Sequence, residues 1–317
     1  MPKTRLFFVT DIHGSDKLFL KFVNAAKIYN CHVVIIGGDI AGKGMVPIFK
    51  SGDIYETEIK GNKYKAKDER ELEEIKKEIR FQGDYPFVTS YNEWNDLIKD
   101  ENKMNKIFDE LIAESINRWC KIAEERLKPL KIKVIINIGN DDPPVVEEIL
   151  KQSDFVIYPN EKIVWIDEYH EMISLGYSNP TPWKLPGDLP EEVLAEKIDK
   201  LVSSVKEIKR CIFNTHVPPY NTHLDLAPKL DENFQPVLTP GGEPELVHVG
   251  STAVRNAIEK YQPLAGLHGH IHESKGYTKI KNTHCFNPGS EYNIGILKGV
   301  VINLSEKKLE NYLFTEG

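Results

Sequence analysis

The chain alternates short, continuously apolar runs with amphipathic stretches, and this rhythm restricts it to few folds. Four runs are rich in Ile, Val and Phe, and each is followed by polar or glycine-containing residues: 6–10, 32–37, 133–138 and 210–214. Between the first two, residues 17–29 have helical spacing and follow Ser15 and Asp16, either of which can cap a helix. Strand, helix and strand in this order predict a largely parallel sheet, and continuous hydrophobicity predicts that helices cover its faces.

The rhythm breaks at about residues 45–130, which we interpret as an insertion within a single domain of residues 1–317. Three parts are expected in it: a hairpin at 54–67 turning at Gly61-Asn62, a charged surface helix at 68–81, and one or two helices over 94–123 with a break near 100–102. We expect these parts to lie beside the functional site or to form a homodimer contact. Short strands are expected again at 276–280, 283–287, 295–303 and 307–314.

Charge and cysteine content narrow the class of protein. The chain has 41 Lys and Arg against 48 Asp and Glu, a net charge of −7. This acidic balance argues against a broad nucleic-acid footprint and against binding to an anionic membrane. No apolar run has membrane-spanning length, the start lacks the pattern of a signal peptide, and the four cysteines form no CxxC pair. We therefore expect a cytoplasmic protein with reduced thiols.

Polar side chains with metal-binding chemistry follow five of the expected strands. They are Asp11 and His13; Asp39; Asn140, Asp141 and Asp142; His216; and His268, His270 and His272. One of them alone would be interpreted as a helix cap or a structural hydrogen bond, but five in order predict a site at one edge of one sheet. Carboxylate, amide and imidazole without thiolate suit Mn²⁺, Fe²⁺ or Zn²⁺, and so many ligands suit two ions that share a carboxylate.

The three alternating histidines raise a geometric problem. In a strand His268, His270 and His272 share one face at about 7 Å spacing, too far apart for one ion that binds each nitrogen at about 2.1 Å. Either this is a polar edge without chemistry, or the histidines serve more than one centre.

The motifs resemble those of calcineurin-like metallophosphoesterases. Five blocks match in order, and Asn287–Ser290 also recurs in many members: Asp11-x-His13, Gly38-Asp39, Gly139-Asn140, His216 and Gly269-His270-x-His272. The resemblance runs from residue 6 to about 290 and leaves the insertion unexplained. It implies a four-layer α/β/β/α sandwich with a hairpin-plus-helix insertion.

The resemblance also implies a role for each block. Asp11, His13 and His272 would hold one metal ion, Asp39 would bridge, and Asn140, His216 and His270 would hold a second ion. The two divalent ions would be Mn, Fe, Zn or Ni, and a hydroxide between them would attack phosphorus. His270 and His272 would then diverge onto two ions, while His268 falls outside the ligand set, as a structural residue or a substrate contact.

Two blocks depart from the family pattern. Asp141 stands where the family usually has a histidine that contacts the phosphate and can protonate the leaving group. Gly42-Lys43-Gly44 stands where the protein phosphatases of this fold carry Asp-Arg-Gly, which argues against protein phosphatase activity.

Further residues are candidates around the metal ligands. Asp141, Asp142 and His268 are candidates for catalysis, and Asn140, His223 and Arg255 for substrate binding. Residues 250–252 would open a helix whose amino terminus binds an anion with help from Arg255, although an ordinary N-cap explains them too.

The sequence therefore predicts a two-metal phosphoesterase that hydrolyses a small phosphate monoester or diester. Two alternatives stay open, a non-catalytic interaction module on the same fold and a nuclease. The intact set of ligands disfavours the first, and the lack of a dense basic patch with aromatic residues disfavours the second.

Overall fold

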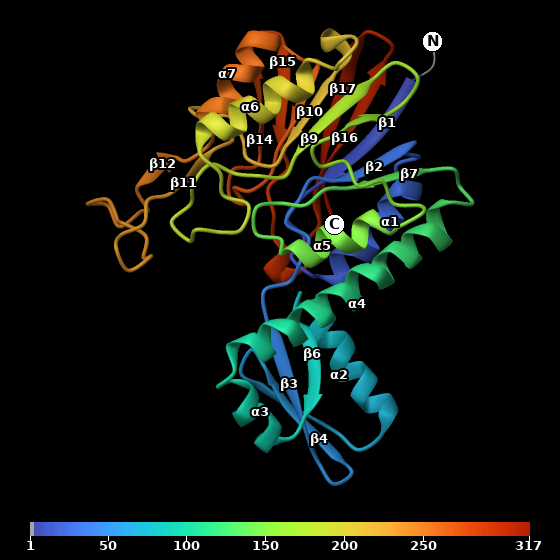
Figure 1. Ribbon diagram of the computed structural model, residues 1–317, viewed down its shortest axis with the longest axis vertical. Helices are drawn as coiled ribbons and strands as arrows, with labels where there is room; N and C mark the ends of the chain where they lie inside the picture. Colours follow the sequence, from blue (N-terminus) through green and yellow to red (C-terminus); the bar gives the residue numbers. More distant parts are fainter. Residues whose placement is uncertain (1–2) are drawn as a thin grey trace.

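Two β-sheets are stacked face to face in the computed structural model, which describes residues 3–317 (Figure 1). The first sheet has the order β17 (Lys308–Glu316), β16 (Lys298–Ser305), β1 (Lys3–Val9), β2 (Val33–Ile36) and β7 (Lys133–Ile136). The second has the order β14 (Gly276–Ile280), β15 (Thr283–Asn287), β13 (Ala265–Leu267), β10 (Ile212–Thr215), β9 (Glu171–Leu175) and β8 (Ile163–Trp165). Strands β1, β2 and β7 of the first sheet and β15, β13, β10 and β9 of the second are parallel, as the alternation of strands and helices predicts.

Helices cover the outer face of each sheet. On the first sheet lie α1 (Asp16–Ile28), α4 (Glu101–Leu127) and α5 (Pro144–Lys151), and on the second α6 (Glu191–Val202) and α7 (Thr252–Tyr261). Neighbouring residues of β1 point to opposite faces: Phe7 packs among the helices, whereas Phe8 packs between the sheets with Leu267 and Phe286. The expected four-layer α/β/β/α sandwich is confirmed.

The insertion forms a lobe below this sandwich (Figure 1). Its sheet has the order β5 (Asn62–Ala66), β4 (Ile54–Ile59), β3 (Met45–Ser51) and β6 (Tyr85–Thr89), and its helices are α2 (Glu69–Phe81) and α3 (Tyr91–Leu97). The lobe has a core of its own, in which Ile48 and Tyr55 pack on Leu72, Ile75 and Ile79 of α2.

Most of the lobe follows the sequence pattern, with differences in the position of the turn, the position of the helix break and the number of strands. The hairpin is present, but it turns at Lys60-Gly61, both at positive φ, and not at Gly61-Asn62. The helical stretch is split at 98–100, where Asp100 caps α4 by accepting a hydrogen bond from Lys103 N at 3.1 Å. Strands β3 and β6 were not expected, and each contains a proline, Pro47 or Pro86, a residue that is uncommon in strands.

Helix α4 connects the lobe with the sandwich. Its carboxyl half packs on α1, where the Trp119 ring stacks on Phe19 with centroids 4.5 Å apart and Trp119 Nε1 donates to Asp16 Oδ1 at 2.6 Å. Its amino half lies on the lobe, where the Phe108 ring contacts Tyr85. One continuous helix therefore belongs to both bodies.

Short elements complete the fold. They are η1 (Ile208–Arg210), η2 (Tyr292–Ile294), and the pair β11 (Leu226–Pro228) and β12 (Leu246–His248), from which residues 229–245 extend as an arm. Among residues 3–317, no helix combines the length and the low charge that crossing a membrane requires.

The lobe meets the sandwich beside the loop that carries His13. Ser15 Oγ donates to Phe81 O at 2.7 Å, and Gly42 N donates to Tyr85 Oη at 2.8 Å. A Cβ atom on Gly83, which has φ +93°, would overlap the carbonyl oxygen of His13. At this position the lobe backbone lies directly against a segment of the site.

We predict that Gly83→Ala destabilises the protein by about 2–4 kcal/mol, because a strained φ of about 1–2 kcal/mol adds to overpacking against His13. Gly52→Ala is the matched control, since Gly52 also has a positive φ of +61° but has open space around its Cβ position. Gly52→Ala should lower the free energy of unfolding only by the cost of the strained φ. Urea-induced unfolding measures both variants, and equal losses would contradict the close approach at Gly83.

Candidate metal centre

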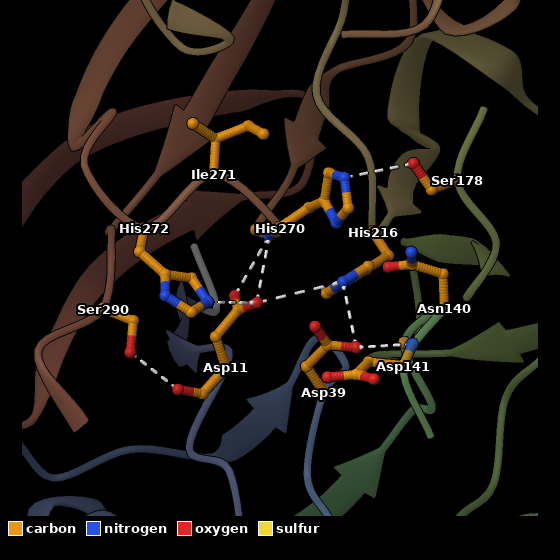
Figure 2. A network of polar contacts seen from close by, with 12 residues as sticks. Asp11, Asp39, Asn140, Asp141, Ser178, His216, His270, Ile271, His272 and Ser290 are labelled. Carbon is orange, nitrogen blue, oxygen red and sulfur yellow. Dashed lines mark hydrogen bonds and ion pairs between the residues drawn. The ribbon is translucent and has the colours of Figure 1, made fainter. Parts of the chain in front are cut away.

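The polar residues that follow the strands converge at one place (Figure 2). They come from the carboxyl ends of five strands: Asp11 after β1, Asp39 after β2, Asn140 after β7, His216 after β10, and His270 and His272 after β13. The expectation of one edge of one sheet is wrong. Strands β1, β2 and β7 belong to the first sheet and β10 and β13 to the second, so the site lies where the carboxyl edges of the two sheets meet.

The first group of ligand atoms joins Asp11, His13 and His272, which lie within 4.8 Å of one another. His272 Nε2 lies 3.2 Å from His13 Nε2 and 3.3 Å from Asp11 Oδ1. Two ligands bound to one ion at about 2.1 Å are separated by about 3 Å, so these spacings suit a shared divalent ion.

The second group joins Asp39, His216 and His270. His216 Nε2 lies 3.3 Å from Asp39 Oδ1, and the other oxygen of Asp39 lies 3.9 Å from His13 Nε2 of the first group. The Asp39 carboxylate therefore lies between the two groups. This is the position that a bridging carboxylate needs.

One further oxygen atom beside the second group, from Asn140, is suited to a metal ion. Asn140 Oδ1 is buried and has no hydrogen-bond partner among the described residues. A buried polar atom without a partner costs about 1–3 kcal/mol, and a metal ion would satisfy this oxygen. The donor set of carboxylates, imidazoles and one amide fits a divalent ion of the Mn²⁺ to Zn²⁺ range.

Four of these ligands have a strained backbone. Asp11, His13, Asp39 and His270 all have positive φ values, between 39° and 67°. Residues with a side chain rarely adopt this region, and each instance costs about 1–3 kcal/mol. Position 139 also requires glycine, because a Cβ atom there would overlap Asp39 Oδ1. The strain turns the side chains towards one another at the ends of the strands.

The Asn287–Ser290 segment holds the turn that carries the last two histidines. Ser290 Oγ donates to Asp11 O at 2.7 Å, and Ser290 N donates to His272 O at 3.1 Å. Asn287 Nδ2 donates to Ile271 O at 3.0 Å. These bonds connect the turn after β13 with the end of β1, and His270 and His272 diverge to the two groups as the resemblance implies.

The buried charges perturb one another strongly. Burial would lower the pKa of His216, but the Asp39 carboxylate raises it to about 9. Burial lowers the pKa of His13 to about 3 and, together with His216, that of His270 to about 4. Burial opposes ionisation of Asp39, yet the charge of His216 holds the Asp39 pKa well below its usual value. The site is thus built around ionised carboxylates, and ion binding would displace the proton of His216.

Asp142 does not belong to the catalytic candidates. Its carboxylate is buried and accepts hydrogen bonds from the backbone N–H groups of Ile40, Ala41 and Gly139, at 2.7–3.1 Å. Burial and the Asp39 charge raise its pKa to about 7, against the effect of these donors. With its oxygens occupied, Asp142 connects the loop after β7 to the loop that carries Asp39.

Asp141 is half-buried beside the site and is paired. Lys43 Nζ lies 2.6 Å from Asp141 Oδ2, while Asp141 N donates to Asp39 Oδ1 at 3.2 Å. Burial would lower the pKa of Lys43, but Asp141 raises it above its usual value. Asp141 also forms a third possible ligand group with His13 and Asp39. A carboxylate and an ammonium group thus occupy the place where the family pattern has a histidine.

Three other candidates lie outside the cluster. His268 is fully buried and its Nδ1 lies 3.0 Å from both Thr215 Oγ1 and Thr215 O, so it cannot contact substrate and is structural. His223 is exposed, and its imidazole lies against Gly276 at the start of β14. Arg255 pairs with Glu259 on its own helix.

The anion site proposed at the start of α7 is wrong. The carboxylate of Glu191 already accepts hydrogen bonds from Ser251 Oγ, Thr252 N and Ala253 N, at 2.6–2.9 Å. The helix amino terminus is therefore filled by a side chain of α6, and the ordinary capping interpretation of Ser251 holds.

Sequence reasoning missed Tyr292 and the role of Lys43. The Tyr292 ring lies 4.5 Å from the His13 ring and 5.7 Å from the His272 ring, centroid to centroid. The hairpin turn of the lobe reaches the same wall, where Lys60 Nζ donates to Asn293 O at 3.2 Å. Lys43 could have been identified from its position four residues after Asp39. No sequence pattern around Tyr292 indicates that it lies at the site.

Comparisons with known proteins agree with this geometry. The sequence profile described as calcineurin-like phosphoesterase matches residues 4–274. The uncharacterized protein MJ1162 of Methanocaldococcus jannaschii is 32% identical over 160 residues, which cover 50% of this chain and 64% of that protein.

Two solved structures share the fold. One crystal structure has a TM-score of 0.60 at 14% identity and covers 98% of both chains. The protein TT1561 of Thermus thermophilus has a TM-score of 0.54 at 13% identity and covers 100% of this chain and 99% of its own.

We predict that Asp142→Asn lowers both the stability and the metal affinity of the protein. The new amide group would turn its NH₂ towards at least one backbone N–H donor, which costs about 2 kcal/mol or more. Thermal unfolding and Mn²⁺ titration measure the two effects. A variant that loses activity while keeping both its melting temperature and its metal affinity would restore Asp142 as a catalytic residue.

Proposed function

Because the chain belongs to the calcineurin-like phosphoesterase family, we propose that it hydrolyses a small phosphoester at a centre of two divalent ions. The observation that carries this proposal is the pair of ligand groups that share Asp39. Their spacing and burial, and the unpartnered oxygen of Asn140 beside them, support two adjacent cations. The ions would be Mn, Fe, Zn or Ni.

Each ligand residue is assigned to one of the two ions or to both. Asp11, His13 and His272 would hold one ion, Asn140, His216 and His270 the other, and Asp39 both. Two bound ions would supply Lewis acidity at the phosphoryl oxygens and a more acidic water. The ligand side chains already lie close together without substrate, so the site is largely preformed.

The Lys43–Asp141 pair sets the charge beside the site. An isolated Asp141 carboxylate would repel a phosphate dianion, but the ammonium group 2.6 Å away offsets its charge. Lys43 is a poor proton donor near neutral pH because Asp141 raises its pKa, and the Asp141 side chain is engaged with that ammonium group. A departing alkoxide would therefore receive little help from this pair.

The two alternative functions make different demands. A non-catalytic interaction module would not need the strain and the buried ligand groups that this site maintains. A nuclease would need a basic surface, whereas the chain carries a net charge of −7. We place the activity in the cytoplasm, since four buried free cysteines are typical of a reducing compartment. A homodimer contact through the lobe stays a prediction.

We predict that the wild-type protein, reconstituted with divalent metal, binds two ions per chain and hydrolyses members of a panel of phosphate monoesters, diesters and nucleotides. Asp39→Asn should abolish hydrolysis, because it removes the shared carboxylate. Elemental analysis and the panel measure these results, with Asp199→Asn, an exposed carboxylate paired with Lys260, as control. Wild-type protein without stoichiometric metal would overturn the enzyme proposal.

We also predict a preference for good leaving groups, such as aryl esters and anhydrides, over alkyl phosphates. Proton donation contributes about 10²–10⁴-fold where a leaving group needs it, and the Lys43–Asp141 pair supplies it poorly. Asp141→His should narrow the gap, mainly through kcat on alkyl substrates. Single-turnover rates measure it. If the wild-type rates on alkyl and aryl esters are similar and Asp141→Asn slows only the alkyl esters, Asp141 is itself the acid.

A further inference from the structure

A loop that sequence reasoning left out wraps around the second ligand group. Residues 176–189 follow β9 and close on themselves, with Ser178 N donating to Gly187 O at 3.1 Å and Leu189 N donating to Ser178 O at 2.8 Å. Ser178 and Asp188 are thereby paired side by side. We call residues 176–189 the positioning loop.

Asp188 fixes the orientation of the Asn140 side chain. Asn140 Nδ2 donates to Asp188 Oδ1 at 2.9 Å, while Gly187 N donates to Asn140 O at 2.9 Å. An amide carries its oxygen and its NH₂ on opposite sides, so a fixed NH₂ fixes the oxygen. That oxygen is the buried, unpartnered Oδ1, which faces His216 in Figure 2.

The loop in turn holds the Asp188 carboxylate. Asp188 Oδ2 accepts hydrogen bonds from Thr181 N at 2.9 Å, Thr181 Oγ1 at 2.6 Å and Leu185 N at 3.0 Å. Three donors on one oxygen and the amide on the other leave the carboxylate a single orientation. The negative charge next to the NH₂ group also polarises the amide and makes its oxygen a better ligand.

The same loop orients a second ligand. Ser178 Oγ lies 3.2 Å from His270 Nε2. Figure 2 shows the other ring nitrogen of His270 directed to the side on which His216 lies. Asn140 and His270 are both assigned to the second ion, and neither belongs to the first ligand group.

We infer that Asp188, supported by the positioning loop, is a positioning residue that sets the affinity of the second metal ion through Asn140. This inference rests on the proposed function, since it concerns the metal centre described there. The inference applies to one ion only. The positioning loop contacts Asn140 and His270, two ligands of the second ion. The ligands of the first ion are held by other segments, among them Ser290 and the lobe residue Gly83, which lies against His13.

The test is Asp188→Asn, titrated with Mn²⁺ alone and followed by calorimetry and electron paramagnetic resonance. The three loop donors outnumber the single amide donor, so the new oxygen should face the loop and the new NH₂ should face Asn140. Asn140 must then flip and present its NH₂ to the ion. The second Mn²⁺ should bind about 10–100-fold more weakly, with the first unchanged.

Two further variants separate positioning from folding. In the double variant Asn140→Asp with Asp188→Asn, the new NH₂ meets a carboxylate oxygen and leaves the other oxygen for the ion, so binding of the second Mn²⁺ should be restored. Asp167→Asn is the matched control. Its carboxylate accepts bonds from Tyr169 N, His170 N and the His170 ring before β9, at the opposite edge of the same sheet. It should leave both ions unaffected.

Other outcomes would reject the inference. If Asp188→Asn binds both ions as the wild type does, Asp188 does not position Asn140. If both ions weaken equally while the melting temperature falls, and the double variant does not recover, Asp188 only stabilises the fold. If the wild type itself does not bind two ions, the proposed function fails as well.

Discussion

The contact between the two sheets is the constraint on which the site depends. Phe8 and Ile35 of the first sheet pack on Leu267 and Phe286 of the second, and this core sets the distance between the sheets. Only then do carboxylates from one sheet meet imidazoles from the other, with Asp39 Oδ1 3.3 Å from His216 Nε2. A change in the packing between the sheets would separate the ligands before it exposed any of them.

Sequence reasoning predicted what is local. The strand ends, the helix after Ser15 and the hairpin of the lobe follow from patterns a few residues long. The membership of each strand in one sheet or the other is not local, which is why a single sheet edge was expected. Asp142 was misjudged for the same reason, because its partners Ile40 and Ala41 lie about a hundred residues away in the sequence. Asp188 carries no motif and is recognised only next to Asn140 in space.

Strain and unsatisfied atoms at the site are offset elsewhere. Four ligands with left-handed backbone would together cost several kcal/mol, which a body with three buried apolar layers can tolerate. The arrangement of ligands that the site needs therefore lowers the free energy of unfolding of the protein. Bound cations would recover part of that cost, so that metal content and resistance to unfolding become linked properties of the molecule.

Helix α4 has a mechanical consequence. Its 27 residues extend about 40 Å without a break, with one half on the lobe and the other packed through Trp119 on the sandwich. A rotation of the lobe relative to the sandwich would have to bend α4 and would separate Gly83 from the loop that carries His13. The lobe and the loop that carries His13 are therefore expected to move as one body. The lobe thus supports the first ligand group from outside, as a buttress of fixed position and not as a closing lid.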